Sequence, residues 1–341
     1  MKLENNLFYY ATGELSQDAF LCWMFSHSIK GSNKDKNIKK CAIEFLKAFI
    51  PELENEKDIF LSNAPERQVN KIDVLLTVND KYKIIIEDKT YTSEHDDQLA
   101  RYRESIKEEF PDHNVVGIYY KTGFQSDRKT VKENDYKYFG LDSIFSILDK
   151  HINSIKNNIF VDYYNYINEL KDEISKFKTL PVSEWNWAQI NGFYDYIKSK
   201  SYGSMNYDYG YVANQSGGFY GMWIANKTYG EYNNLKYELY LQCEFAEQRL
   251  NICYKASSQD DLKIDRATRE SFIWENDNGK WKDTAASFGF TKPKRYGSGK
   301  TVTFGLYKDN ELITDYLSAE SKIYNAIDDF KRMINKLGIS K

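Results

Sequence analysis

The chain has 341 residues, 41% of them hydrophobic and 28% charged, a composition that argues against long disordered segments. It contains no apolar run of about 18 residues and no basic-then-apolar start, so we expect neither a membrane-spanning helix nor a signal peptide, and hence a cytoplasmic protein. The net charge of −3 argues against a protein that simply coats DNA, because such proteins are usually strongly basic.

Two helices are predicted before the first strand. Apolar residues recur at helical spacing through Leu15–Ile29, and a Gly-Ser-Asn sequence at 31–33 ends that helix. A second helix is predicted over Asn37–Phe49. It ends before Pro51 because the residue that precedes a proline is disfavoured in the helical conformation.

A β-hairpin follows, where the apolar period changes from helical spacing to alternation. Lys71–Val78 alternates, and Tyr82–Lys89 contains three consecutive isoleucines. The pair Asn79-Asp80 between them favours a turn. The two runs therefore predict neighbouring antiparallel strands.

The order of the elements predicts the fold class of the N-terminal part. A helix is expected over Leu99–Phe110, a short buried strand over Asn114–Tyr120, and mostly helix over Leu141–Phe177. Helix, strands, helix and strand in this order predict an α/β domain with a mixed sheet flanked by helices.

A second domain is predicted where the composition shifts and tyrosine, tryptophan and glycine become frequent. Strands are expected there over Phe219–Ala225, Tyr237–Phe245 and Leu250–Tyr254. We place the boundary near Leu180, which gives an α/β domain over residues 1–180 and a tyrosine-rich α+β domain over residues 181–341.

The hairpin carries the residues best suited to chemistry. Side chains alternate along a strand, so Glu87 and Lys89 point to one face and Asp88 to the other. A three-residue loop centred on Asp80 would place Asp73 directly across from Glu87, about 5 Å apart at Cβ, whereas a two-residue loop would shift the pairing by one.

Two carboxylates this close repel each other unless a cation lies between them. Oxygen ligands suit Mg²⁺ or Mn²⁺, so Asp73, Glu87 and the backbone carbonyl of Asp88 are candidate metal ligands. Lys89 beside them could hold a water molecule or hydroxide and offset charge on a phosphate. Such a set of groups is suited to the hydrolysis of a phosphodiester.

The same residues resemble the PD-(D/E)XK nuclease superfamily: Asp73, a hairpin, and then Glu87-Asp88-Lys89 at the end of an apolar strand. Ile72 stands where the superfamily often has proline. Gln98 and Tyr102, which share a helical face, resemble the QxxxY motif of its RecB-like branch. The segment 13–20 resembles the opening of a bacterial branch, and the resemblance covers roughly residues 8–125.

This resemblance implies a restriction-endonuclease-like core and roles for further residues. A glutamate on the first helix often joins the metal site of the superfamily, and Glu14 is the candidate here, with Glu44 on the neighbouring helix as the alternative. Gln98 and Tyr102 would line the substrate groove. The four cysteines have no CxxC spacing, so the cysteine-ligated cluster of some RecB-like proteins is not expected.

The expected function is that of a Mg²⁺- or Mn²⁺-dependent nuclease acting on DNA, by analogy with restriction, repair or phage-defence enzymes. RNA or a small nucleotide is an alternative substrate. A hypothesis of a different class is a nucleic-acid or protein binding module that keeps the fold without catalysis. In that case Asp73, Glu87 and Lys89 would form a structural ion-pair cluster.

Overall fold

The computed structural model describes residues 5–32, 34–90, 92, 94, 97–214, 217–232, 235–259, 264, 280–293, 299–307 and 313–337. Contacts divide the chain into two compact units, Met1–Asp172 and Glu173–Lys341. Among the described residues, no helix combines the length and apolar character needed to cross a membrane. All four cysteines are free thiols.

A mixed five-stranded sheet, in the order β1-β2-β3-β4-β5, forms the centre of the first unit. Strands β1, β2 and β3 pair antiparallel, while β3, β4 and β5 pair parallel. The strands span Glu66–Val69 (β1), Ile72–Val78 (β2), Tyr82–Lys89 (β3), Asn114–Lys121 (β4) and Tyr136–Gly140 (β5). The parallel strands β3 and β4 are joined through helix α3, as parallel neighbours require a crossover connection.

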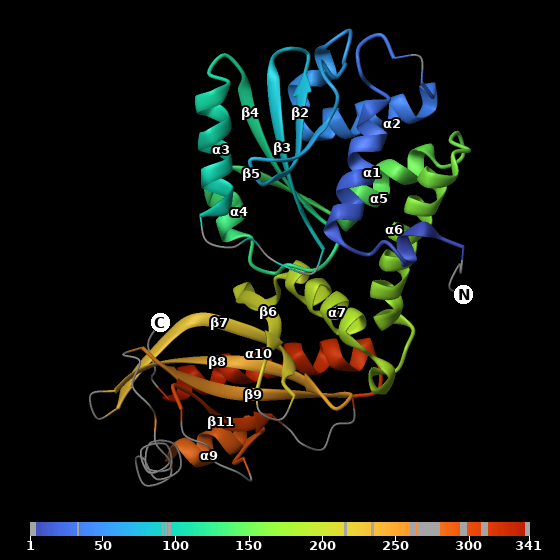
Figure 1. Cartoon of the computed structure of the whole chain (residues 1–341). Helices are drawn as coiled ribbons and strands as arrows, with labels where there is room; N and C mark the ends of the chain where they lie inside the picture. The colour runs from blue at the N-terminus through green and yellow to red at the C-terminus, as the bar shows by residue number, and fades with distance from the viewer. Residues whose placement is uncertain are drawn as a thin grey trace. The chain divides into compact units, whose positions relative to one another are not determined.

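Helices cover both faces of this sheet (Figure 1). They span Glu14–Ser26 (α1), Lys36–Phe49 (α2), Gln98–Glu109 (α3), Lys129–Glu133 (α4), Leu141–His151 (α5) and Asn158–Ser175 (α6), with 3-10 turns at Leu7–Tyr9 and Pro51–Asn55. Side chains of α1, α2, α5 and α6 share one apolar core with the sheet, and those of α3 and α4 share the other. The sheet is therefore enclosed between two helical layers.

The three isoleucines of β3 anchor the strand in both cores. Ile84 and Ile86 lie in the core under α1 and α2, and Ile85 lies in the core under α3, all without exposed surface. Burial of each side chain contributes about 1.5–3 kcal/mol. A strand held in this way on both faces cannot rotate, so the directions of the next side chains, Glu87 to Lys89, are fixed.

The second unit contains an antiparallel six-stranded sheet in the order β10-β11-β9-β8-β7-β6. Its strands are β6 (Asn206–Val212), β7 (Phe219–Tyr232), β8 (Leu235–Ala246), β9 (Arg249–Ser258), β10 (Phe290–Thr291) and β11 (Thr301–Tyr307). Its helices are α7 (Trp187–Lys200), α9 (Lys280–Ser287) and α10 (Tyr316–Leu337), with 3-10 turns at Lys176–Lys178, Val182–Glu184 and Tyr202–Ser204. Helix α7 packs on β6 and β7, and α10 packs on β8 and β9.

Candidate active site

The β2–β3 hairpin brings the two predicted acids close together. Its strands pair from Val78–Tyr82 to Val74–Ile86, the register of a three-residue loop. Asp73 and Glu87 follow one position beyond the last of these pairs, and the Asp73 charge acts on Glu87. Asn79 in that loop has a left-handed φ of 52°, a conformation that asparagine adopts more readily than most residues. Turn chemistry and strand register therefore act together to position the acids.

Glu87 and Lys89 form a buried ion pair on the face of the sheet toward α3. Lys89 Nζ lies 2.5 Å from Glu87 Oε1, and the Glu87 side chain has no exposed surface. Burial, reinforced by the nearby Asp73 carboxylate, raises the pKa of Glu87 to about 7. Burial alone would lower the pKa of Lys89, but the carboxylates of Glu87, Asp73 and Glu14 together outweigh it and the net shift is upward.

Asp73 is held at both carboxylate oxygens. The backbone N–H of Asp88 donates to Asp73 Oδ2 at 2.9 Å, and Gln68 Nε2 donates to Oδ1 at 3.0 Å. Burial raises the pKa of Asp73, an effect that the Asp88 hydrogen bond and the charge of Lys89 oppose. Asp73 therefore lies in the electrostatic field of the Glu87–Lys89 pair.

Asp88 points to the opposite face of the strand, as the alternation predicted. Its Oδ1 accepts a hydrogen bond from Gln17 Nε2 on α1, and neither Asp88 nor the neighbouring Asp18 has exposed surface. Burial, together with the charge of Asp18, raises the pKa of Asp88 well above its usual range. Burial likewise raises the pKa of Asp18 to about 7. The Asp88 side chain thus belongs to a separate acidic pair beneath α1.

The first two turns of α3 bring Gln98 and Tyr102 to the site. Gln98 Nε2 donates to Glu87 Oε1 at 2.8 Å and lies 3.1 Å from the Tyr102 hydroxyl. The four-residue spacing places both side chains on one helical face. Gln98 therefore fixes the same oxygen that Lys89 contacts.

The two glutamates considered for the first helices have different surroundings. Glu14 Oε1 accepts hydrogen bonds from the Thr90 backbone N–H at 3.0 Å and from Thr92 Oγ1 at 2.8 Å, directly after β3. Its charge reaches Asp73 and Glu87 electrostatically. Glu44 instead bonds Lys150 and His151, at 2.5 and 2.7 Å. Of the two, the structure brings Glu14 toward the hairpin acids.

Comparison with known proteins agrees with this geometry. The family model of the PD-(D/E)XK nuclease superfamily matches residues 5–178 of the chain. The chain belongs to the PD-(D/E)XK nuclease superfamily. The matched range includes the hairpin, both helical layers and the first turn of α3, and it ends before the antiparallel sheet of the second unit. No curated protein and no solved structure matches the chain.

PD-(D/E)XK nucleases generally use divalent metal ions, and one carboxylate oxygen of this site is suited to bind such an ion. Glu87 Oε2 is buried and has no hydrogen-bond partner among the residues that the structure describes. Within that same part of the chain, no three His, Cys, Asp or Glu side chains form a complete ligand cluster. Mg²⁺ needs only one or two carboxylates and takes its other ligands from water, carbonyl groups and phosphate. Glu87 and Asp73 meet that smaller requirement.

Sequence reasoning missed Lys121, the last residue of β4, which pairs with Lys89 in the parallel ladder. Its ammonium group donates to the Thr92 carbonyl oxygen at 2.5 Å and has no exposed surface. Burial lowers the pKa of Lys121 to about 8. Its position at the end of an apolar strand, like that of Lys89, is the signal that could have identified it.

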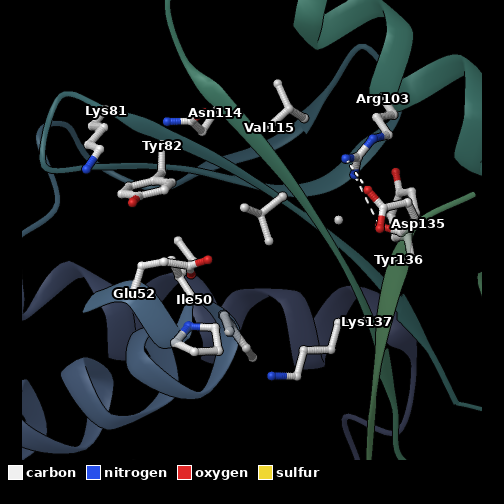
Figure 2. A pocket seen from close by; sticks show the side chains of 14 residues that line it. Ile50, Glu52, Lys81, Tyr82, Arg103, Asn114, Val115, Asp135, Tyr136 and Lys137 are labelled. Atoms are coloured by element: carbon white, nitrogen blue, oxygen red, sulfur yellow. Dashed lines mark hydrogen bonds and ion pairs between the residues drawn. The ribbon is translucent and has the colours of Figure 1, made fainter. Parts of the chain in front are cut away.

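A cavity of about 610 Å³ lies at the other end of the parallel strands. Figure 2 shows Tyr82, Asn114 and Tyr136 around it, from the starts of β3, β4 and β5, with the Arg103–Asp135 ion pair at one side. Glu87, Asp88 and Lys89 are at the carboxyl end of β3, Lys121 is at the carboxyl end of β4, and Asp73 is at the adjoining start of the antiparallel strand β2. The candidate active site therefore follows the usual location of sites in sheets of this type, and the cavity is separate from it.

Proposed function

We propose that this chain is a metal-dependent phosphodiester hydrolase that cleaves DNA. The observation that carries the proposal is the Glu87–Lys89 ion pair close to Asp73, whose second Glu87 oxygen has no hydrogen-bond partner in the described part of the chain. A buried lysine beside two close acids is costly for folding alone. A catalytic role accounts for its presence there.

In this proposal Asp73, Glu87 and the backbone carbonyl of Asp88 hold Mg²⁺ or Mn²⁺, with Glu14 as a further ligand. The ion would supply charge stabilisation to the phosphate and lower the pKa of a bound water molecule. Each Asp73 oxygen accepts one hydrogen bond from the described residues and keeps further lone pairs. Glu87 Oε2 has all of its acceptor capacity left among the described residues.

Lys89 would orient the attacking water. Its pKa is raised by the Glu87 carboxylate despite its burial, so the amine is protonated at neutral pH and donates hydrogen bonds. A protonated amine cannot remove a proton from water, but it holds a water or hydroxide and balances negative charge on the phosphate. Gln98 and Tyr102 would face the substrate beside it.

DNA is the proposed substrate because the resemblance of the hairpin and of Gln98/Tyr102 is to restriction, repair and phage-defence nucleases. The test is cleavage of plasmid, single-stranded DNA and RNA by the full chain, with Mg²⁺, Mn²⁺ or EDTA. We expect cleavage of DNA with metal, no cleavage in EDTA, and loss of cleavage in the Lys89→Met protein.

Glu44→Gln is the matched control, since it removes a carboxylate whose partners are Lys150 and His151. It should cleave like the wild type. Nucleic-acid binding in EDTA without cleavage of any substrate would instead identify a binding module, and cleavage confined to RNA would overturn the substrate assignment.

A further inference from the structure

Gln68 lies on the edge strand β1 directly opposite Asp73. The pairs Arg67–Val74 and Val69–Ile72 flank this position, so Gln68 and Asp73 stand across from each other in the β1–β2 ladder. Gln68 Nε2 is 3.0 Å from Asp73 Oδ1. The side chain therefore contacts the proposed metal ligand from the strand next to it.

The same amide nitrogen also reaches α1. Gln68 Nε2 is 3.4 Å from Asp18 Oδ2, and Asp18 is fully buried. An amide NH₂ group carries two hydrogens, so it can donate to both carboxylates at once. Gln68 thus links Asp73 to a rigid element of the core and opposes rotation of the Asp73 carboxylate.

The backbone of Gln68 gives a second, independent indication. Its φ is 59°, in the left-handed region that costs a non-glycine residue about 1–2 kcal/mol. Glycine adopts this conformation without that cost. A glutamine at a position that favours glycine indicates that its side chain is needed, and strained residues of this type gather at functional sites.

We propose that Gln68 is a positioning residue that orients Asp73 for binding the divalent ion. The inference rests on the proposed function, because the orientation of Asp73 matters only if this residue holds a metal. Partners that orient metal ligands typically account for 10–100-fold in metal affinity. Gln68 is exposed and its hydrogen bonds compete with water, so we expect the lower end, about 10-fold.

The experiment measures Mn²⁺ binding to the full chain by electron paramagnetic resonance, without substrate. Gln68→Gly removes the side chain and relieves the left-handed backbone. Asn70→Gly is the matched control: Asn70 also has a left-handed φ, 52°, but its side chain reaches Glu109 at 3.5 Å. Both variants should melt at or above the wild-type temperature. Only Gln68→Gly should raise the Kd for Mn²⁺, by about 10-fold.

A second variant, Gln68→Asn, keeps an amide on a side chain one methylene shorter and tolerates the left-handed backbone. It should bind Mn²⁺ as weakly as Gln68→Gly. Wild-type affinity in both Gln68 variants, or equal weakening in Asn70→Gly, would overturn the positioning role while leaving the nuclease proposal intact. Wild-type protein that binds no Mn²⁺, or binds it equally well after Asp73→Asn, would overturn the proposed function itself.

Discussion

Strand β3 carries an acid on each of its two faces, and the two acids have different neighbours. Toward α3, Glu87 has a lysine at 2.5 Å, an amide donor at 2.8 Å and an oxygen without a partner among the described residues. Toward α1, Asp88 faces a second acid, Asp18, and an amide from Gln17, and burial raises the pKa of both acids. Burial raises the pKa of Glu87 as well, to about 7, but Lys89 opposes that rise, whereas the charge of Asp18 adds to the rise at Asp88.

The contrast shows why the acid spacing alone does not identify the chemistry. Glu87 and Asp88 are adjacent in sequence and equally buried. What separates them is the partner that each face supplies: an ammonium group on one side and a carboxyl group on the other. Desolvation favours the neutral form of any buried acid, and a nearby cation opposes this effect, so the acid beside the cation ionises more readily and is the better metal ligand.

The largest expected effect is a difference in cleavage rate between variants on the two faces of β3. Glu87→Gln should lower the cleavage rate by about 100-fold or more, because it removes a charge needed at the reacting phosphate. Asp88→Asn should keep at least about a tenth of the wild-type rate, because it leaves the backbone carbonyl in place. Rates are measured on plasmid with Mg²⁺, and circular dichroism checks that both proteins are folded. Equal losses in the two variants would contradict the division into a catalytic and a structural face.

The second prediction concerns stability on the α1 face, measured in EDTA. The pKa of Asp18 is about 7 in the folded chain against a usual 3.8, so the folded state holds a proton that the unfolded state releases. This lowers the free energy of unfolding progressively as pH rises from about 4 to about 7. Asp18→Asn removes the titration, and should therefore be more stable than wild type at pH 8, by on the order of 2 kcal/mol, and equally stable at pH 4.

The measurement is the melting temperature of both proteins across this pH range. A gain of on the order of 2 kcal/mol corresponds to several degrees in a unit of this size. A parallel pair of curves, with no change in the difference between pH 4 and pH 8, would show that Asp18 is ionised at neutral pH and would remove the contrast between the faces.

Much of the first unit could be predicted from the sequence. Tyr82–Lys89 forms β3 with the predicted bounds, and the first three predicted helices differ from α1, α2 and α3 only near their ends. The predicted, mostly helical stretch Leu141–Phe177 contains two helices, α5 and α6. Strong periodicity and clear turn residues determine such elements. The strands β1 (Glu66–Val69) and β5 (Tyr136–Gly140) were missed, because the first is short and polar and the second is five residues of mixed character. Edge strands have little burial and hence little apolar pattern.

The site was predictable in part, for the same physical reason. Alternation along β3 and the loop register place Glu87, Lys89 and Asp73 without knowledge of the fold. Gln68 and Lys121 could not be placed, because their contacts depend on which strands lie next to β2 and β3. Strand order across a sheet is a non-local property, and local sequence patterns do not contain it.

The smallest expected effect is on stability, and it comes from a comparison of two lysines on the same face of β3. Lys83 is buried, 2.9 Å from Thr77 Oγ1 and 3.6 Å above the Phe110 ring, and burial lowers its pKa. Lys89 is also buried, but the Glu87 carboxylate raises its pKa. If the carboxylate causes this difference, the charge on Lys83 destabilises the folded state, and Lys83→Met should stabilise the protein by about 1 kcal/mol at pH 7.

The stability gained in Lys83→Met should depend on pH, and the sign of that dependence makes the test specific. A lowered lysine pKa means that the unfolded state binds more protons, so wild-type stability rises with pH until the unfolded value of about 10.5 is passed. The advantage of Lys83→Met should therefore shrink between pH 7 and pH 10 in urea denaturation. A constant or growing advantage would mean that folding does not lower the pKa of Lys83, and that packing, and not charge, sets the difference. The carboxylate partner could then no longer explain why the two lysines of β3 differ.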